Sequence, residues 1–422
     1  MRILSRAASS TWANYFDACA TTPPAAEVLE AMAAVHAGAW ANPSSLHGFG
    51  VAAGEQLERS RQRIGELLGC LSSQVLFTSG ATESIHTALL GVASGMPAGR
   101  LLISTVEHPA TLAAATQLQR LGWQVEQVPV DRVGQVRQEL LEQLLVPPTR
   151  LVSLIWGQSE VGTIQPLLAI GNSCRKAGVL LHVDAVQVVG HQLINFNSMP
   201  VDLLSLTAHK LQGPRGIGAL LLRPDIRLTP LIAGGGQESG MRGGTEPVAL
   251  VAGLTRALEL AVERLVCQGG NDPIAPLRDA LLEQLMLLDD IQLTGPDPRD
   301  RHAPERLPHH LSVLLAGPDG HPVSGRRLVR CLWQQGYAVS SGSACSSGVA
   351  ASHGGHAPSP VLQAMGYADR VAGSGLRFSL GAWHRGADLV GVAAALQRAR
   401  RQLLTAGTTD QGSGQACAPR FS

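Results

Sequence analysis

The chain has 422 residues, 45% of them hydrophobic, so it can bury a large α/β core with an appended smaller domain. Its 33 basic and 32 acidic residues leave a formal net charge of +1, which argues against direct nucleic-acid binding. Seven widely spaced cysteines without a C-x-x-C pair disfavour a disulfide framework and a metal-ligand set, and they favour a reducing, cytoplasmic compartment.

Residues 1–14 are predicted to form a flexible leader, although an acid-free segment with two arginines also fits a short targeting sequence. No apolar run is long enough to span a membrane, so no membrane association is predicted. The best candidate, residues 248–265, carries charges at helical spacing and reads as an amphipathic helix.

From about residue 75, short apolar runs alternate with helical patterns. This alternation predicts a mainly parallel sheet of seven strands flanked by helices, with ligands at the carboxyl ends of the strands. The predicted strands are 74–79, 101–106, 123–130, 150–156, 179–184, 201–206 and 218–223, with helices at 109–122 and 166–178.

The pattern changes near residue 266, where 267–273 resembles a linker. Beyond it, an α+β pattern predicts a smaller C-terminal domain, with helices at 276–290, 325–336 and 387–404 and strands at 309–317, 337–341 and 375–381. We therefore expect a large domain over 24–265, a small α+β domain formed by 15–23 and 266–406, and a disordered tail over 407–422.

Polar residues follow several of the predicted strands. In "FTSGATES" (77–84), the backbone N–H groups of Gly80, Ala81 and Thr82 could hold a phosphate, although the same pattern also fits an ordinary helix cap. His108 ends another strand just before a proline, and a lone histidine there is commonly structural. Asp184 also stands at a strand end, where it could cap a helix or meet a cationic ring nitrogen.

The stretch "LTAHKLQGPRGIGALLLR" (206–223) places Thr207, His209 and Lys210 at a further strand end. Together these strand ends supply a phosphate cradle, an imidazole, a carboxylate and an amine. Pyridoxal phosphate requires this combination, because its aldehyde condenses with a lysine and its ring nitrogen works best beside a carboxylate.

The ordered motifs of the chain are similar to those of a known family. They are "FDACATTPP", "NPSSLHGFG", "FTSGATES", "EHPATL", "HVDAVQVVG", "AHKLQGPRGIGAL", "GGGQESGMRGGTEP", "SSGSACSS" and "LRFSLG", spread from about residue 15 to 404. The sequence resembles the cysteine desulfurases of the class V aminotransferase group, which are fold-type I pyridoxal phosphate enzymes.

The resemblance implies a role for each matching residue. Lys210 would bind pyridoxal 5'-phosphate covalently, and His108 would stack on its ring and assist proton transfer. Asp184 would pair with the ring nitrogen, while Gln187 would donate a hydrogen bond to the ring oxygen. Ser159 stands where the family usually has an asparagine that contacts the same oxygen, and serine is shorter.

The remaining implied roles concern the phosphate, the substrate and a partner subunit. Thr82, Thr207 and His209 would hold the phosphate. Thr245 would reach the phosphate of the neighbouring subunit, which implies a homodimer. Arg377 would bind the α-carboxylate of L-cysteine in bidentate fashion, and Asn42 would line the substrate pocket.

Cys345 lies in a segment of small residues (340–360) that reads as a mobile loop, unlike Cys331 in the apolar "LVRCLW". The resemblance implies that it receives sulfur from L-cysteine as a persulfide, leaving alanine, and passes it to a sulfur-acceptor or scaffold protein for iron–sulfur cluster assembly or tRNA thiolation. His353 and His356 in this long loop read as part of a flexible insertion, so no metal site is predicted.

Other interpretations remain open at this stage. A selenocysteine lyase, a cystine or cysteine C–S lyase and a divergent aminotransferase use the same cofactor. Ala208 and Gly243, where the family usually has glycine and serine, together with Ser159, also leave open a low-activity homologue that acts as a partner-binding subunit. A nucleotide-binding protein is disfavoured, because the chain has no Walker lysine.

Overall fold

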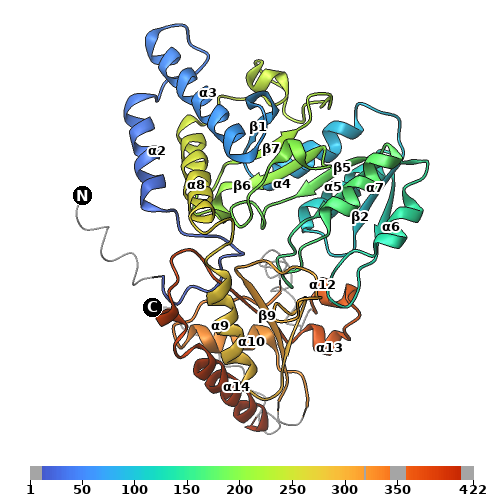
Figure 1. Ribbon diagram of the computed structural model, residues 1–422, viewed down its shortest axis with the longest axis vertical. Helices are drawn as coiled ribbons and strands as arrows, with labels where there is room; N and C mark the ends of the chain where they lie inside the picture. Colours follow the sequence, from blue (N-terminus) through green and yellow to red (C-terminus); the bar gives the residue numbers. More distant parts are fainter. Residues whose placement is uncertain (1–11, 318–319, 343–357, 410–422) are drawn as a thin grey trace.

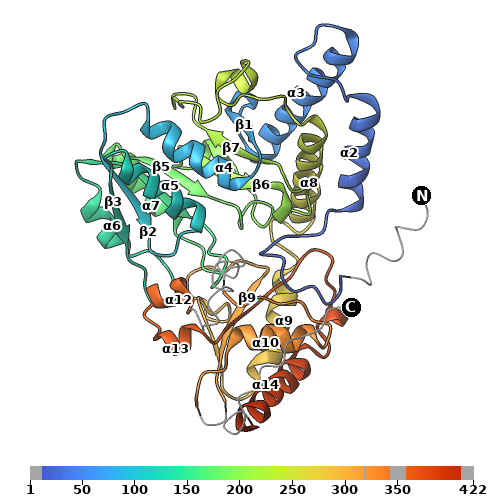
Figure 2. The ribbon, with the colours of Figure 1, turned by 180° about the vertical axis from the view of Figure 1, so that it is seen from behind.

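A computed structural model describes residues 12–317, 320–342 and 358–409. Two sheets organise these residues. Figures 1 and 2 show the larger sheet at one end of the molecule and the smaller sheet at the other, together with α9 (Ala275–Met286), α10 (Gly325–Trp333) and α14 (Val392–Thr409). Within the described residues, no helix is long and apolar enough to cross a membrane.

All seven predicted strands of the larger sheet are present, in the order β1-β7-β6-β5-β4-β2-β3. Four of the six strand pairs are parallel, while β7 runs antiparallel to both of its neighbours. The mainly parallel sheet is therefore confirmed. The strands are β1 (Val75–Thr78), β2 (Arg100–Ser104), β3 (Gln124–Val128), β4 (Thr149–Ile155), β5 (Leu180–Asp184), β6 (Leu203–Thr207) and β7 (Gly218–Leu222).

Alternate side chains of these strands enter separate cores on the two faces, as strand geometry requires. In β2, Leu102 packs into the largest core with residues of α3, α6, α7 and α8, whereas Leu101 and Ile103 pack with α4 and α5. Both faces are thus covered, which explains why the strands read as continuous apolar runs. The helices are α2 (Ala26–Gly38), α3 (Gly48–Leu68), α4 (Ala81–His86), α5 (Pro109–Arg120), α6 (Gln138–Leu144), α7 (Leu167–Ala177) and α8 (Val248–Val266).

The smaller sheet is antiparallel, in the order β10-β9-β8, and shares a second core with helices from the C-terminal part. The predicted strand at 337–341 is absent; this segment makes only isolated bridges, Tyr15 with Ala338 and Ser340 with Arg377. The elements are α9 (Ala275–Met286), β8 (Ile291–Leu293), β9 (His310–Leu315), α10 (Gly325–Trp333), α12 (Pro360–Ala364), α13 (Asp369–Ala372), β10 (Gly375–Ser379) and α14 (Val392–Thr409).

The N-terminal segment 15–22 runs between the two sheets. Phe16 is fully buried in the core of the smaller sheet, and Asp17 forms a bridge with Ser379 of β10. A few residues later, the Thr22 N–H donates to the carbonyl of His209 at the edge of the larger sheet (2.9 Å). The segment therefore joins the two sheets, although the predicted domain boundaries stay predictions.

Candidate active site

The carboxyl ends of five strands of the larger sheet meet at one cavity of about 410 Å³. Thr207 and Asp184 are the last residues of β6 and β5. Gly80, His108 and Ser159 follow β1, β2 and β4 within four residues. Parallel strands bring their carboxyl ends to one edge, so the sheet gathers residues that are far apart in the sequence.

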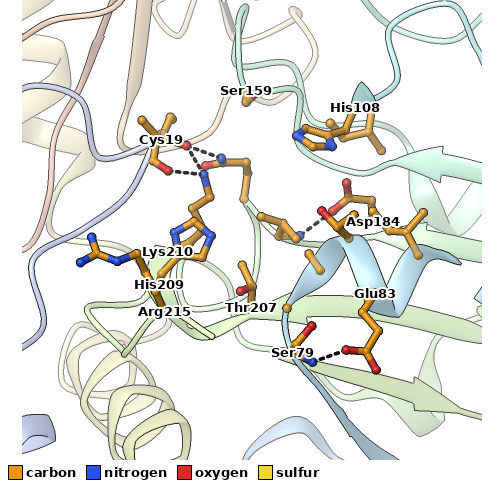
Figure 3. A pocket seen from close by; sticks show the side chains of 18 of the residues that line it. Cys19, Ser79, Glu83, His108, Ser159, Asp184, Thr207, His209, Lys210 and Arg215 are labelled. Atoms are coloured by element: carbon orange, nitrogen blue, oxygen red, sulfur yellow. Dashed lines mark hydrogen bonds between the residues drawn. The ribbon is translucent and has the colours of Figure 1, made fainter. Parts of the chain in front are cut away.

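Lys210 reaches into this cavity from a single turn of 3₁₀ helix, Ala208–Lys210, directly after β6. Its ammonium group donates hydrogen bonds to the carbonyl of Cys19 and to the carbonyl of Ala20 (2.8 Å). Figure 3 shows Lys210 and Cys19 on the side of the cavity opposite His108 and Asp184. Two backbone carbonyls of the N-terminal segment thus hold the amine that the turn after β6 brings to the cavity.

Asp184 lines the opposite wall of the cavity, and a second buried carboxyl group, Glu107, interacts with it electrostatically. Burial raises the pKa of Asp184, whose Oδ1 accepts from the Val186 N–H (3.0 Å). Burial also raises the pKa of Glu107 to about 8, against the lowering effect of its hydrogen bond from Ser104 Oγ (2.5 Å), so this carboxyl is mostly neutral at pH 7. Asp184 is therefore the group in this pair that a cation in the cavity would ionise.

Thr207 and His209 stand on the same wall as Lys210. The Thr207 hydroxyl donates to the carbonyl of Ile217 (3.2 Å). Burial, with the nearby charges of Lys210 and Arg215, lowers the pKa of His209 to about 4, so its ring is neutral at pH 7. A Cβ on Gly218 of β7 would lie 2.8 Å from Cα of Gly80, so this glycine allows the strand to pass directly behind the Gly80 turn.

Arg377 reaches the cavity from β10 in the smaller sheet and is only 2% exposed. Its guanidinium forms an ion pair with Asp17 (2.7 Å) and donates to the carbonyl of Ser159 (3.0 Å). His310 donates to the same Ser159 carbonyl through Nε2 (3.1 Å). The smaller sheet therefore supplies a fixed cation to a cavity that is otherwise lined by residues at or following the strand ends of the larger sheet and by the N-terminal segment.

The ion pair between Asp17 and Arg377 gives a first prediction. We expect Asp17→Asn to lower the free energy of unfolding by about 2 kcal/mol, because it leaves a buried guanidinium without its countercharge. Asp297→Asn is the matched control, since Asp297 and Arg299 are also 2.7 Å apart but their side chains are 36% and 48% exposed. Breaking this surface pair should cost less than about 1 kcal/mol. Equal losses in chemical denaturation would contradict the assignment.

Residues 14–389 match the model of the aminotransferase class-V family. The chain belongs to this family. Within it, a cysteine desulfurase IscS of Dictyoglomus turgidum is 36% identical over 394 residues, covering 93% of this chain and 95% of the relative. A cysteine desulfurase of Cereibacter sphaeroides is 38% identical over 379 residues, covering 89% and 92%.

Solved structures of this family agree with the relatives. A NifS-like protein superposes with a TM-score of 0.81 at 33% identity, covering 93% of this chain and 99% of that protein. SspA in complex with cysteine superposes with a TM-score of 0.73 at 30% identity, covering 87% and 98%. The chain therefore belongs to the cysteine desulfurase branch, and the resemblance and the fold predicted from its motifs are confirmed.

Most of the site residues predicted from the class-V motifs line the one cavity. They are Gly80, Ala81, Thr82, His108, Ser159, Asp184, Gln187, Thr207, His209, Lys210 and Arg377. Asn42 and Thr245 do not line it: Asn42 is exposed and accepts from the Ser44 N–H (2.9 Å), and Thr245 is exposed in the loop before α8. Cys345, His353 and His356 lie outside the described residues.

Several residues that line this cavity were not predicted from the sequence as site residues. Cys19 and Ala20 belong to "FDACATTPP", a motif that carried the resemblance, and they contact Lys210 through backbone carbonyls that leave no signal in residue type. Arg215 lies in "GPRGIG" and Glu83 in "FTSGATES". The Glu83 carboxylate accepts from the Ser79 N–H (2.7 Å) and from Arg242 (3.0 Å), so it holds the Gly80 turn in place.

Proposed function

We propose that the protein is a pyridoxal phosphate-dependent cysteine desulfurase, which takes sulfur from L-cysteine, releases L-alanine and carries the sulfur as a persulfide on Cys345. The observation that carries this proposal is the placement of Lys210 and the buried Asp184 in one cavity that Arg377 also lines. An amine, a carboxylate and a guanidinium are the groups that this chemistry needs for the aldehyde, the ring nitrogen and the substrate carboxylate.

The donor set of the cavity fits the cofactor. Burial raises the pKa of Asp184, so a protonated ring nitrogen beside it would favour the ionised carboxylate. Thr82, His209 and the backbone at Gly80 and Ala81 offer donors for a phosphate. Pyridoxal phosphate, when bound, supplies an aldehyde for the amines and a ring that withdraws electrons from the substrate Cα.

The chain's own residues would then act on L-cysteine. Arg377 holds the α-carboxylate, and Lys210, freed as an amine, takes the Cα proton. The Cys345 thiolate attacks the substrate sulfur, so that an S–S bond forms while the Cβ–S bond breaks. The electron pair of the broken bond stays on the carbon skeleton, which takes up protons and leaves as alanine. No external oxidant is needed, because the two-electron oxidation of the transferred sulfur is balanced by reduction of the substrate Cβ, which keeps the electron pair and becomes the methyl group of alanine.

The proposal also includes a substrate, a second subunit and a protein that accepts the sulfur. SspA has been solved in complex with cysteine, which favours L-cysteine as the substrate. The exposed loop that carries Thr245 suits a homodimer in which Thr245 reaches the neighbouring phosphate. A sulfur-acceptor or scaffold protein would take the persulfide, and we retain the cytoplasm as the predicted compartment.

The test is an assay of the purified chain with L-cysteine and pyridoxal phosphate, in which alanine is measured and the persulfide is located by mass spectrometry. We expect the wild-type chain to release alanine and to carry the added sulfur on Cys345. Cys345→Ser should lower alanine release by roughly 100-fold or more, because a hydroxyl is a far poorer nucleophile toward sulfur at neutral pH.

Cys331→Ser is the control, because Cys331 is buried in α10 and should leave the persulfide unchanged. Pyruvate and ammonia in place of alanine would instead identify a C–S lyase. A chain that binds pyridoxal phosphate but turns over no L-cysteine would favour the partner-binding subunit, for which Ser159 is the relevant departure.

A further inference from the structure

Gln187 is the only amide side chain among the described residues that line the cavity. Gln158, which precedes Ser159, does not line the cavity, and both ends of its amide form hydrogen bonds with the backbone. Its oxygen accepts from the Val161 N–H (3.1 Å), and its nitrogen donates to the carbonyl of Val106 (3.1 Å). Ser159 is shorter than the asparagine that usually occupies its position. The orientation of the Gln187 amide therefore decides whether an amide N–H can donate a hydrogen bond into the cavity.

A backbone carbonyl identifies the nitrogen and the oxygen of the Gln187 amide. Its nitrogen lies 3.0 Å from the carbonyl oxygen of Cys19, which can only accept a hydrogen bond. The amide oxygen therefore lies at the other end, 3.2 Å from Nε2 of His309. An amide oxygen can only accept, so His309 must carry its proton on Nε2.

The surroundings of His309 agree with this tautomer. His309 is 2% exposed, and burial, followed by the charges of its neighbours, lowers its pKa well below the ordinary value, so the ring is neutral with a single proton. Nδ1 has no hydrogen-bond partner among the described residues, whereas Nε2 also lies 3.3 Å from the Cys19 sulfur. A proton on Nε2 serves both acceptors, and a proton on Nδ1 would serve neither.

A second histidine holds the plane of this ring. His191 stacks on His309 with 3.8 Å between the ring centroids and 13° between the planes. His191 is itself bound through Nδ1 to Asp272 (2.6 Å), which also pairs with Arg264 (3.5 Å). The proton of His309 is thus aimed in a fixed direction.

We propose that His309 is a positioning residue, which holds the Gln187 amide through its oxygen so that the second N–H of that amide stays directed at the ring oxygen of the cofactor. This inference rests on the proposed function, because it assumes pyridoxal phosphate in the cavity. A fixed N–H at that oxygen favours its negative form and thereby lowers the pKa of the linkage between Lys210 and the cofactor.

The experiment is a spectrophotometric pH titration of the resting holoenzyme, without substrate, for the wild-type chain, His309→Leu and His309→Gln. We expect His309→Leu to move the midpoint of the visible band upward by about 0.5 to 1 pH unit, the equivalent of one weakened hydrogen bond. His309→Gln should restore the wild-type midpoint, because its amide nitrogen can reach the Gln187 oxygen. His309→Asn, which is shorter, should behave as His309→Leu and replaces that variant if it does not fold.

His182→Leu is the matched control. His182 is also fully buried, between Ser153 and Ser205 (2.8 Å each), but it does not line the cavity. It should lose stability and keep the midpoint. Equal midpoints for His309→Leu and the wild-type chain, or for His309→Leu and His309→Gln, would overturn the proposal.

A measurement on the full chain without cofactor separates this inference from the proposed function. Nuclear magnetic resonance of isotope-labelled histidine ring nitrogens, assigned by comparison with His309→Gln, should find the proton of His309 on Nε2. A proton on Nδ1 overturns the network itself. A wild-type chain that develops no visible band with pyridoxal phosphate overturns the proposed function, and with it the cofactor half of this inference.

Discussion

Lys210→Ala is expected to reduce L-cysteine turnover by roughly 1000-fold or more, because it removes both the covalent attachment point and the base for the Cα proton. The chain contains only two lysines, Lys176 and Lys210, which makes the assignment a choice between two residues. Lys176 is exposed in α7 and does not line the cavity. Lys176→Ala is therefore the natural control and should keep full activity.

The same two-lysine chain allows a direct measurement. Borohydride reduction of the protein with bound pyridoxal phosphate should fix one cofactor on the peptide that contains Lys210 and none on the peptide that contains Lys176. The Lys210→Ala chain should take up no label. Labelling of Lys176, or unchanged turnover after Lys210→Ala, would show that Lys210 is not the covalent catalyst.

Asp184→Asn is expected to lower turnover by roughly 100- to 1000-fold, because a neutral amide cannot hold a protonated ring nitrogen. The same substitution should make the cofactor-free protein more stable at neutral pH. Burial raises the pKa of Asp184 in the folded chain, so folding works against the ionised form that prevails in the unfolded chain. Asparagine removes this cost and can still accept from the Val186 N–H.

The pH dependence of that stability difference has a definite sign. At low pH the carboxyl is protonated in both states, so the two cofactor-free proteins should be equally stable. As pH rises through the unfolded pKa toward the raised folded one, the wild-type chain should lose stability relative to Asp184→Asn. Unfolding measured from pH 3 to pH 7 checks this. A constant difference would contradict the ionisation argument.

Asp202→Asn is the matched control for Asp184→Asn. Burial also raises the pKa of Asp202, which accepts from the Leu181 N–H (2.7 Å). Asp202 precedes β6, however, so it lies at the opposite edge of the sheet from the cavity. We expect Asp202→Asn to keep turnover, and a comparable loss would mean that activity responds to any buried carboxylate.

The sequence predicted the seven strands and the residues at their ends, because apolar runs and strand-end polarity are local properties. It did not predict the reversed direction of β7, since Gly218–Leu222 is as apolar as the strands that run the other way. β8 is three residues long and only partly buried, so it is too short to show a hydrophobic periodicity in the sequence. The segment 337–341 resembles a strand in its local sequence. Whether such a segment forms a strand or only isolated bridges depends on its tertiary contacts, which the local sequence does not show.

Groups that act through geometry escaped prediction for a different reason. Asp17 holds Arg377 from a distance of 360 residues in the chain, and nothing near either residue reveals the other. The contacts of Lys210 with Cys19 and Ala20 use backbone carbonyls, which every residue has. His309 was predicted as the first residue of a strand, which begins instead at His310, and its buried ring contacts Gln187.

The bridge between Asp17 and Ser379 has a consequence for how the protein is made. The segment that contacts Lys210 leaves the ribosome long before β10, the strand that holds this segment, because 360 residues separate Cys19 from Ser379. The larger sheet can form earlier, from neighbouring stretches, but its cavity lacks one wall until β10 has been synthesised. We therefore expect ribosome-bound chains that end before β10 to leave pyridoxal phosphate in solution, so that the cofactor is acquired only after β10 has been synthesised.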